Sequence, residues 1–310
     1  MKSSTFNFKD QDDFEINVYK WEPESQPKAA VQIVHGMAEH AKRYERFAEF
    51  LIKNGYICYA DDHRGHGKTI ELNNMAPGYL GETGWDGTVN EIHHLSTIIK
   101  KENPNIPLFL IGHSWGSFLS QDIIQKWSED YKAVILLGSN GSQKKTVIKI
   151  GKSIANKQVK KLGATEPSPK MDDLSFGKYN KPYKKEPNAT GYEWLSRDKS
   201  EVQKYIDDPL SGFIAPGSFY VEMLTAFERL WDIEKEKKIS KDLPIMFASG
   251  EEDPVSNKTK DLIPLLERYR EIGIREVAVK FYKGARHELL NETNRDEVFN
   301  DLLEWLNSHL

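Results

Sequence analysis

Residues 107–116 read PLFLIGHSWG, and the rest of the chain can be understood from this stretch outward. The apolar run at 108–111 is too short for a helix and is typical of a buried strand. After the Gly-x-Ser-x-Gly pattern, residues 117–124 carry apolar side chains at helical spacing. A strand, a sharp turn and a helix form the context of a nucleophile elbow, in which a strained turn exposes a serine hydroxyl. The sequence therefore predicts Ser114 as a nucleophile.

The two glycines of this pattern, Gly112 and Gly116, support that prediction. A side chain at either position would collide with the neighbouring strand or helix as the backbone doubles back. The bare pattern often arises by chance, so the flanking strand and helix carry most of its weight. A serine that only caps the helix is the alternative interpretation. This alternative weakens if an oxyanion loop, an acid and a base also appear in the expected order along the chain.

Composition and charge limit the class of protein. The 310 residues include 43 basic and 47 acidic side chains, for a net charge of −4, which argues against a nucleic-acid binder. The length suits one large α/β domain with an insertion or two small domains. No apolar run is long enough to span a bilayer, and the N-terminal residues lack the apolar region of a signal peptide. The single cysteine, Cys58, lies in a predicted strand, so we expect a buried thiol and a reducing, cytoplasmic setting.

Apolar strands and amphipathic helices alternate along most of the chain. This alternation predicts a mostly parallel, doubly wound α/β sheet with helices on both faces. It stops between residues 141 and 216, so we expect a core of residues 1–140 and 217–310 with a helical cap insertion at 141–216. Ligands of such sheets bind beyond the carboxyl ends of the strands, where the cap would lie. The expected strands are 4–8, 14–21, 29–34, 56–60, 108–111, 133–138, 243–250 and 276–282, and helices are expected at 257–272 and 297–310.

A serine nucleophile needs a histidine as base and an acid that orients it. In folds of this type the chain order is serine, acid, histidine. Asp253 lies in the turn after the penultimate strand, where Pro254 stiffens the backbone, and His287 follows the last strand by a short loop. We therefore expect Asp253 and His287 to complete the site, and we expect His113 to point away from Ser114. A solvated acidic turn and a helix-capping histidine are the alternatives.

The oxyanion formed during acyl transfer needs preorganised N–H donors. One donor is expected from the backbone of Trp115, the residue after the nucleophile, and the other from the loop after the first buried strand. In that loop, His35-Gly36-Met37 turns at the glycine, so Met37 would supply the second N–H.

Two histidine spacings, His63-x-x-His66 and His35 to His40, also suggest a metal site. No companion cysteine pair is present, and the neighbouring Asp62 fits a hydrogen-bonded loop equally well. The sequence therefore predicts no metal ligand and no cofactor.

Taken together, these motifs resemble the α/β-hydrolase superfamily, and within it the monoacylglycerol lipase and lysophospholipase group, which is also classed with the S33 serine aminopeptidases. The resemblance implies that carboxylic esters, such as monoacylglycerols or lysophospholipids, are cleaved through an acyl-enzyme on Ser114. It implies the same triad and the same two oxyanion donors. Met37 departs from the smaller residue common in the lipases, and Thr69 stands where serine is usual. The matching segments are residues 35–40, 62–67, 112–116, 250–255 and 284–288.

The predicted cap is strongly basic. Residues 144–185 contain twelve lysines and three acidic residues, and residues 144–162 form a helical stretch with a rough apolar stripe. A basic amphipathic helix could dock on an anionic bilayer, while a solvated face on a mobile lid is the alternative. An apolar substrate channel is expected from four aromatic residues, for which ordinary core packing is equally compatible. These are Trp194, Phe213, Phe219 and Tyr220.

Two other functions stay open. A peptidase of the same fold that removes an N-terminal residue would need an acidic anchor for the substrate amine, and Glu193 or Asp198 could serve. The other is a non-catalytic binding protein on the same scaffold, which an intact triad argues against.

Overall fold

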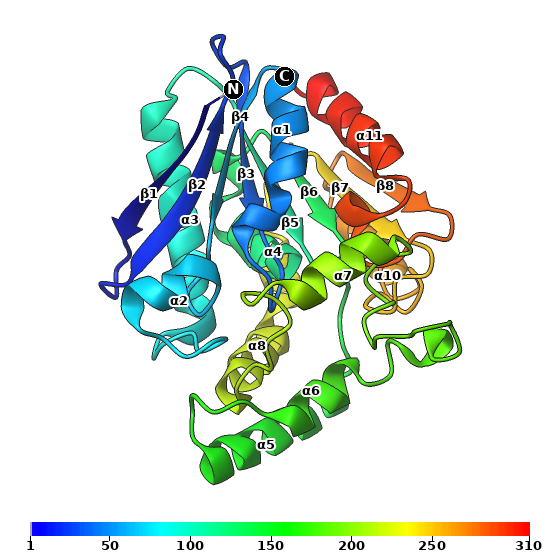
Figure 1. Ribbon diagram of the computed structural model, residues 1–310. Coiled ribbons are helices and arrows are strands. Elements are labelled where there is room, and N and C mark those ends of the chain that lie inside the picture. Colours follow the sequence, from blue (N-terminus) through cyan, green and yellow to red (C-terminus); the bar gives the residue numbers. More distant parts are fainter. Residues whose placement is uncertain (1) are drawn as a thin grey trace.

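The computed structural model describes residues 2–310 as one eight-stranded sheet with helices on both faces (Figure 1). The strand order is β1-β2-β4-β3-β5-β6-β7-β8. β2 pairs in an antiparallel direction with both β1 and β4. The six strands β4, β3, β5, β6, β7 and β8 are parallel to one another. The predicted mostly parallel α/β fold is thus confirmed. The strands are β1 Lys2–Lys9, β2 Glu15–Glu22, β3 Ala29–Val34, β4 Tyr56–Asp61, β5 Leu108–His113, β6 Ala133–Leu137, β7 Ile245–Gly250 and β8 Val277–Tyr282.

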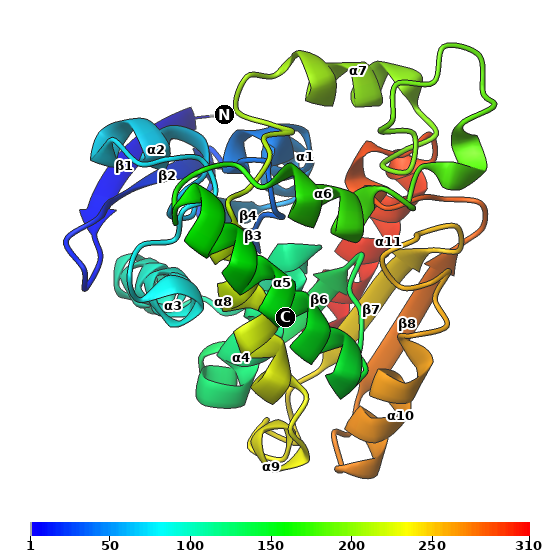
Figure 2. The same cartoon turned by 90° about the horizontal axis from the view of Figure 1, so that it is seen from below.

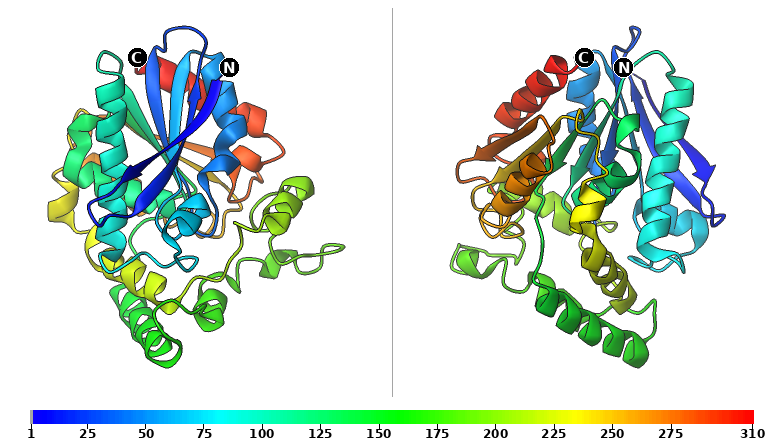
Figure 3. Two further views of the ribbon diagram at one scale, coloured as in Figure 1. Left: turned by 60° about the vertical axis from the view of Figure 1, so that its left-hand side comes forward. Right: turned by 180° about the vertical axis from the view of Figure 1, so that it is seen from behind.

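Alternation along the buried strands divides the apolar core in two. In β5, Leu108 and Leu110 face one layer, and Phe109 and Ile111 face the other. The first layer lies under α3 (Gly84–Glu102), α4 (Trp115–Trp127), α8 (Gly217–Leu230) and α10 (Ile263–Glu271). The second lies under α1 (Glu45–Lys53) and α11 (Arg295–Ser308), which appear together on one side in Figure 3. Shorter helical segments are η1 Ala41–Tyr44, α2 Gly67–Asn73, η2 Ser128–Asp130, α9 Ile233–Glu236 and η4 Leu289–Asn291.

The segment 141–216 is helical, and we call it the cap segment. It holds α5 (Lys145–Leu162), α6 (Pro169–Phe176), η3 (Lys181–Tyr183) and α7 (Lys199–Asp207). α5 and α6 lie below the sheet in Figure 1 and in front of its edge in Figure 2. α5 packs closely on α8, because Gly217 leaves room for the backbone of α5 at Ala155.

Two elements differ from the prediction. The helix expected at 257–272 begins only at Ile263, since Asn257, Lys258 and Thr259 have φ values of 52°, 58° and 69°. A right-handed helix cannot contain three consecutive left-handed residues, so residues 254–262 form turns instead. The strand–helix alternation also did not indicate α8, which connects the cap segment to the core.

Candidate active site

Ser114 sits on a strained turn between β5 and α4. Its backbone has φ 52° and ψ −121°, a conformation that residues other than glycine rarely adopt. A Cβ added to Gly112 would lie 2.3 Å from Ser120 Oγ, and one added to Gly116 would lie 2.2 Å from the carbonyl oxygen of Val34. Both glycines are therefore required for the close approach of α4 to the sheet, as the sequence predicts.

The three predicted triad residues meet at the carboxyl edge of the sheet. His287 Nε2 lies 2.8 Å from Ser114 Oγ, and His287 Nδ1 lies 3.0 Å from each carboxylate oxygen of Asp253. Asp253 is fully buried, and its carboxylate also accepts a 2.9 Å hydrogen bond from the Val255 amide. In this geometry the imidazole can take the serine proton while the carboxylate holds the opposite ring nitrogen.

The two predicted oxyanion donors both have free amides. Trp115 is the first residue of α4, where the helix cannot supply an acceptor for the N–H group. Met37 lies in the loop that follows β3. Within residues 2–310, neither amide donates a hydrogen bond to another group of the protein. Both N–H groups are thus available to an oxygen bound beside Ser114.

Glu39 supports this loop, and the sequence interpretation gave it no role. Its Oε1 accepts a 2.7 Å hydrogen bond from the Gly36 amide and lies 3.1 Å from His113 Nδ1, while Arg43 pairs with its Oε2. Burial alone raises the pKa of Glu39, but the charges of Arg43 and His113 outweigh burial and hold the pKa well below its ordinary value. The carboxylate therefore stays ionised and ties the loop of Met37 to the elbow.

A second buried carboxylate stabilises the His287 loop. Glu288 receives two 2.8 Å hydrogen bonds from the guanidinium of Arg43, in the bidentate geometry that favours this pairing. His113 also contributes to the site. Its ring centre lies 4.9 Å from that of His287, and its Nδ1 lies 3.1 Å from Glu39 Oε1, so the ring packs beside the predicted base. The sequence signal that could have indicated this network is the position of Glu288 directly after His287, the predicted base.

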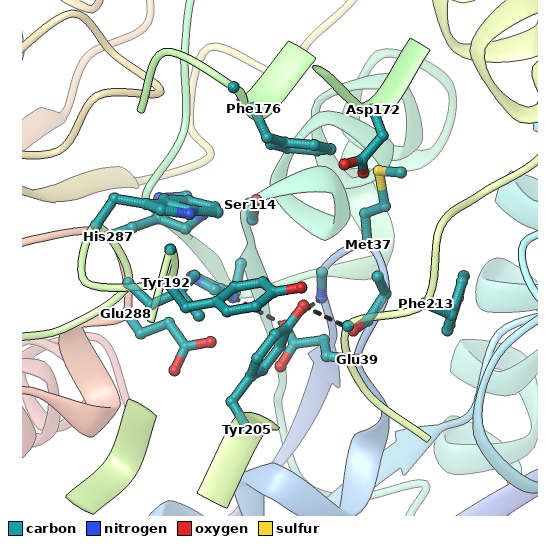
Figure 4. A pocket seen from close by; sticks show the side chains of 18 of the residues that line it. Met37, Glu39, Ser114, Asp172, Phe176, Tyr192, Tyr205, Phe213, His287 and Glu288 are labelled. Carbon is teal, nitrogen blue, oxygen red and sulfur yellow. Dashed lines mark hydrogen bonds and ion pairs between the residues drawn. The ribbon is translucent and has the colours of Figure 1, made fainter. Parts of the chain in front are cut away.

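A cavity of about 310 Å³ opens over Ser114 between the sheet edge and the cap segment (Figure 4). Met37 and His287 line its core side, and Trp194 and Phe213 line it as predicted. The Trp194 ring centre lies 5.2 Å from that of His287. The cavity therefore combines apolar walls with direct access to the serine hydroxyl.

The prediction that Phe219 and Tyr220 line the channel is wrong. Both side chains lie on α8 within the hydrophobic core, at 0% and 1% exposure, and neither borders the cavity. The ring centre of Phe219 is 5.0 Å from that of Trp115. These residues face inward because α8 must bury one side against α4 and the sheet, so they stabilise packing.

The two acids considered as amine anchors are already engaged. Glu193 accepts hydrogen bonds from Asn180 and from the Thr190 amide; burial alone raises its pKa, but these donors outweigh burial and lower it to about 2. Asp198 caps α7 and pairs with Arg295 at 2.8 Å. Neither carboxylate lines the cavity, so the structure offers no place for a substrate amine at either residue.

The histidine loop after β4 contains one cluster that could hold a cation. Ligand atoms of Asp61, His63 and Glu91 lie within 4.8 Å of one another. Both oxygens of Glu91, however, accept hydrogen bonds from Arg64, at 3.0 Å from its amide and 2.8 Å from its Nε. Since the guanidinium already supplies the positive charge, this donor set fits a braced loop better than a metal site.

The sheet order, the strained serine and its histidine and aspartate partners define a serine hydrolase of the α/β-hydrolase fold. A family model described as "Serine aminopeptidase, S33" matches residues 25–294. The chain belongs to this family.

Curated relatives and solved structures agree with this class. The chain is 25% identical to a monoacylglycerol lipase of Mycolicibacterium smegmatis, over 94% of this chain and 92% of the relative. It is 27% identical to a monoglyceride lipase of Mus musculus, over 93% and 84%. A thermostable carboxyl esterase from Bacillus coagulans, solved in complex with glycerol, has the same fold, with a TM-score of 0.87, 24% identity and 99% coverage of both chains. The predicted enzyme class, a carboxylic-ester hydrolase, is confirmed.

Proposed function

We propose that the protein hydrolyses acyl esters such as monoacylglycerols or lysophospholipids through an acyl-enzyme on Ser114. The observation that carries this proposal is the 2.8 Å approach of His287 Nε2 to Ser114 Oγ. His287 takes the hydroxyl proton as the oxygen attacks the ester carbonyl, and the Met37 and Trp115 amides donate to the oxyanion. His287 then protonates the departing alcohol. A water molecule, deprotonated by the same ring, releases the acid and restores the serine.

The cap segment is proposed to select the substrate. Its residues Phe176, Tyr192 and Trp194 form part of the cavity wall opposite the elbow. An ester bound at Ser114 would lie against these side chains, so their size and shape would help to set which head groups and acyl chains fit.

A peripheral contact with membranes is part of the proposal. α5 exposes 56% of Val147 and 61% of Ile150 among its lysines, and α6 exposes 53% of Leu174. Exposed apolar side chains framed by lysines favour an anionic lipid surface. Among residues 2–310, no helix has both the length and the apolar character needed to cross a bilayer.

A cytoplasmic, reducing location stays a prediction from the cysteine content. The one cysteine, Cys58, is buried in β4, and burial raises the pKa of its thiol well above the usual value. A neutral, buried thiol is consistent with a structural role and not with a nucleophile.

The decisive experiment compares substrate classes in the wild type and in Ser114→Ala. We expect turnover of monoacylglycerols, lysophospholipids and p-nitrophenyl esters, no turnover of aminoacyl anilides, and a loss of about 10³-fold or more in the variant. Ser153→Ala, an exposed serine on α5, is the matched control and should retain activity. Anilide cleavage without ester cleavage would favour the peptidase, and failure of a fluorophosphonate to label Ser114 would favour a non-catalytic binding protein.

A further inference from the structure

The acidic residues of the basic cap are unevenly placed. Residues 144–185 contain twelve lysines and only three acids, yet two of those acids, Asp172 and Asp173, line the cavity over Ser114. Within residues 2–310, no lysine or arginine side chain lines that cavity. The inner surface of the cap segment is therefore acidic although its outer surface is basic.

Asp172, like its neighbour Asp173, differs from the two glutamates that line the cavity wall. Glu39 and Glu288 are both paired with Arg43. Asp172 is half-buried and, in the described part of the chain, has no hydrogen bond and no ion pair through its side chain. Burial, followed by the negative charge of Asp173, raises its pKa above the ordinary value. A carboxylate kept in such a place without a counter-charge is stabilised by any cation that enters the cavity.

Two aromatic side chains line the same cavity as this carboxylate. Phe176 follows Asp172 by four residues on α6, so the two lie on the same face of the helix and border the cavity together. Figure 4 shows both side chains at the cavity wall above Met37 and Ser114. Tyr192 also lines the cavity, and burial, followed by the negative charge of Asp172, raises the pKa of its hydroxyl. Aromatic faces beside a carboxylate are the groups that bind ammonium ions.

We propose that Asp172, Phe176 and Tyr192 form a subsite for a positively charged ammonium group carried by the ester substrate. This inference rests on the proposed ester hydrolysis and narrows its substrate class. Esters with a choline-like or amine head group gain an attraction to this wall that neutral glycerol esters lack. Anionic head groups without a cation are disfavoured at the same place.

The test uses two esters of nearly equal shape, butyrylcholine and its uncharged isostere 3,3-dimethylbutyl butyrate. In the wild type we expect kcat/KM for the choline ester to be about tenfold higher. In Asp172→Asn the ratio should fall to near one, while kcat/KM for the neutral ester stays within about twofold. Phe176→Leu should also lower the ratio. Asp207→Asn, an exposed aspartate on α7, is the matched control and should leave the ratio unchanged.

A second measurement needs no variant. Tetramethylammonium should slow fluorophosphonate labelling of Ser114 in the wild type, whereas the same concentration of the uncharged tert-butanol should not. Equal kcat/KM for the two esters, an equal loss for both in Asp172→Asn, or no protection by tetramethylammonium would each overturn the cation subsite. Failure of the wild type to hydrolyse either ester would instead overturn the proposed function.

Discussion

Among single residues, Glu39 shows how a side chain outside the triad can control the site. One carboxylate joins the Gly36 amide, the His113 ring and the Arg43 guanidinium. Gly36, whose amide donates to Glu39, directly precedes the proposed oxyanion donor Met37. A change in the charge of Glu39 should therefore act on the orientation of that amide.

Glu39→Gln keeps the size of the side chain and removes its charge. We expect kcat for ester hydrolysis to fall about tenfold or more with little change in KM, because an oxyanion donor acts mainly in the transition state. Loss of hydrogen bonds to a buried charge should lower the free energy of unfolding by about 2 kcal/mol. Steady-state kinetics and urea unfolding measure both effects.

Glu49→Gln, on α1, provides the control for this change, because in the described part of the chain the Glu49 side chain has no hydrogen bond or ion pair. A raised KM with unchanged kcat would contradict the role assigned to Glu39.

At the scale of elements, α5 has two distinct faces. Ile148 and Ala155 are buried, at 2% and 0% exposure, in the layer that contains α8. This packing leaves Val147 and Ile150 on the outside together with the lysines. Only part of the apolar stripe in residues 144–162 is thus satisfied by contacts within the chain, which supports the proposed membrane contact.

Sedimentation with lipid vesicles tests this contact. We expect more protein to pellet with anionic than with neutral vesicles, and the difference to shrink as ionic strength rises. Lys149→Glu combined with Lys157→Glu should reduce pelleting with anionic vesicles. Lys101→Glu, at the end of α3 that leads into the start of β5, is the control and should have little effect. Equal pelleting with both vesicle types would contradict the proposal.

Across the whole molecule, His66 links three parts of the chain. Its ring stacks on Trp115 of the elbow at 5.3 Å and lies 5.3 Å from Phe213 of the cap segment, while the residue itself belongs to the loop after β4. Burial lowers the pKa of His66 to about 3. The folded protein therefore keeps this imidazole neutral at pH values where the unfolded chain would protonate it.

The free energy of unfolding should fall as the pH is lowered, because the unfolded chain takes up a proton on His66 that the folded protein does not. The stability that the protein gains by keeping His66 neutral is fully present above the unfolded pKa of about 6.5. It is lost as the pH falls toward the folded value of about 3. His66→Gln removes this titration. The wild type should therefore lose about 2 kcal/mol of unfolding free energy relative to the variant between pH 6.5 and pH 5.

Urea unfolding at both pH values measures this difference, and His94→Gln, an exposed histidine on α3, should show no such change. A difference between the wild type and His66→Gln that stays constant with pH would contradict the assignment.

The order of the elements and the meeting of Ser114, Asp253 and His287 could be predicted from the chain alone. Apolar runs of strand length mark the sheet, and parallel strands bring the turns at their carboxyl ends to one edge. The spacing of turns and glycines is a local property, so it can be recognised without knowing which helices pack together.

The faces of the cap and of α8 depended on three-dimensional packing. Phe219 and Tyr220 on α8 face the core, although their aromatic character suggested that they line the substrate channel. Asp172 on α6 lines the cavity instead. The network of Glu39, Arg43 and Glu288 likewise joins segments about 245 residues apart. Helical periodicity shows that one face will be buried but not against which partner. The partner of each helix face is determined by contacts between distant segments. There, the free energy gained by burying apolar area outweighs the local conformational preference of the residues.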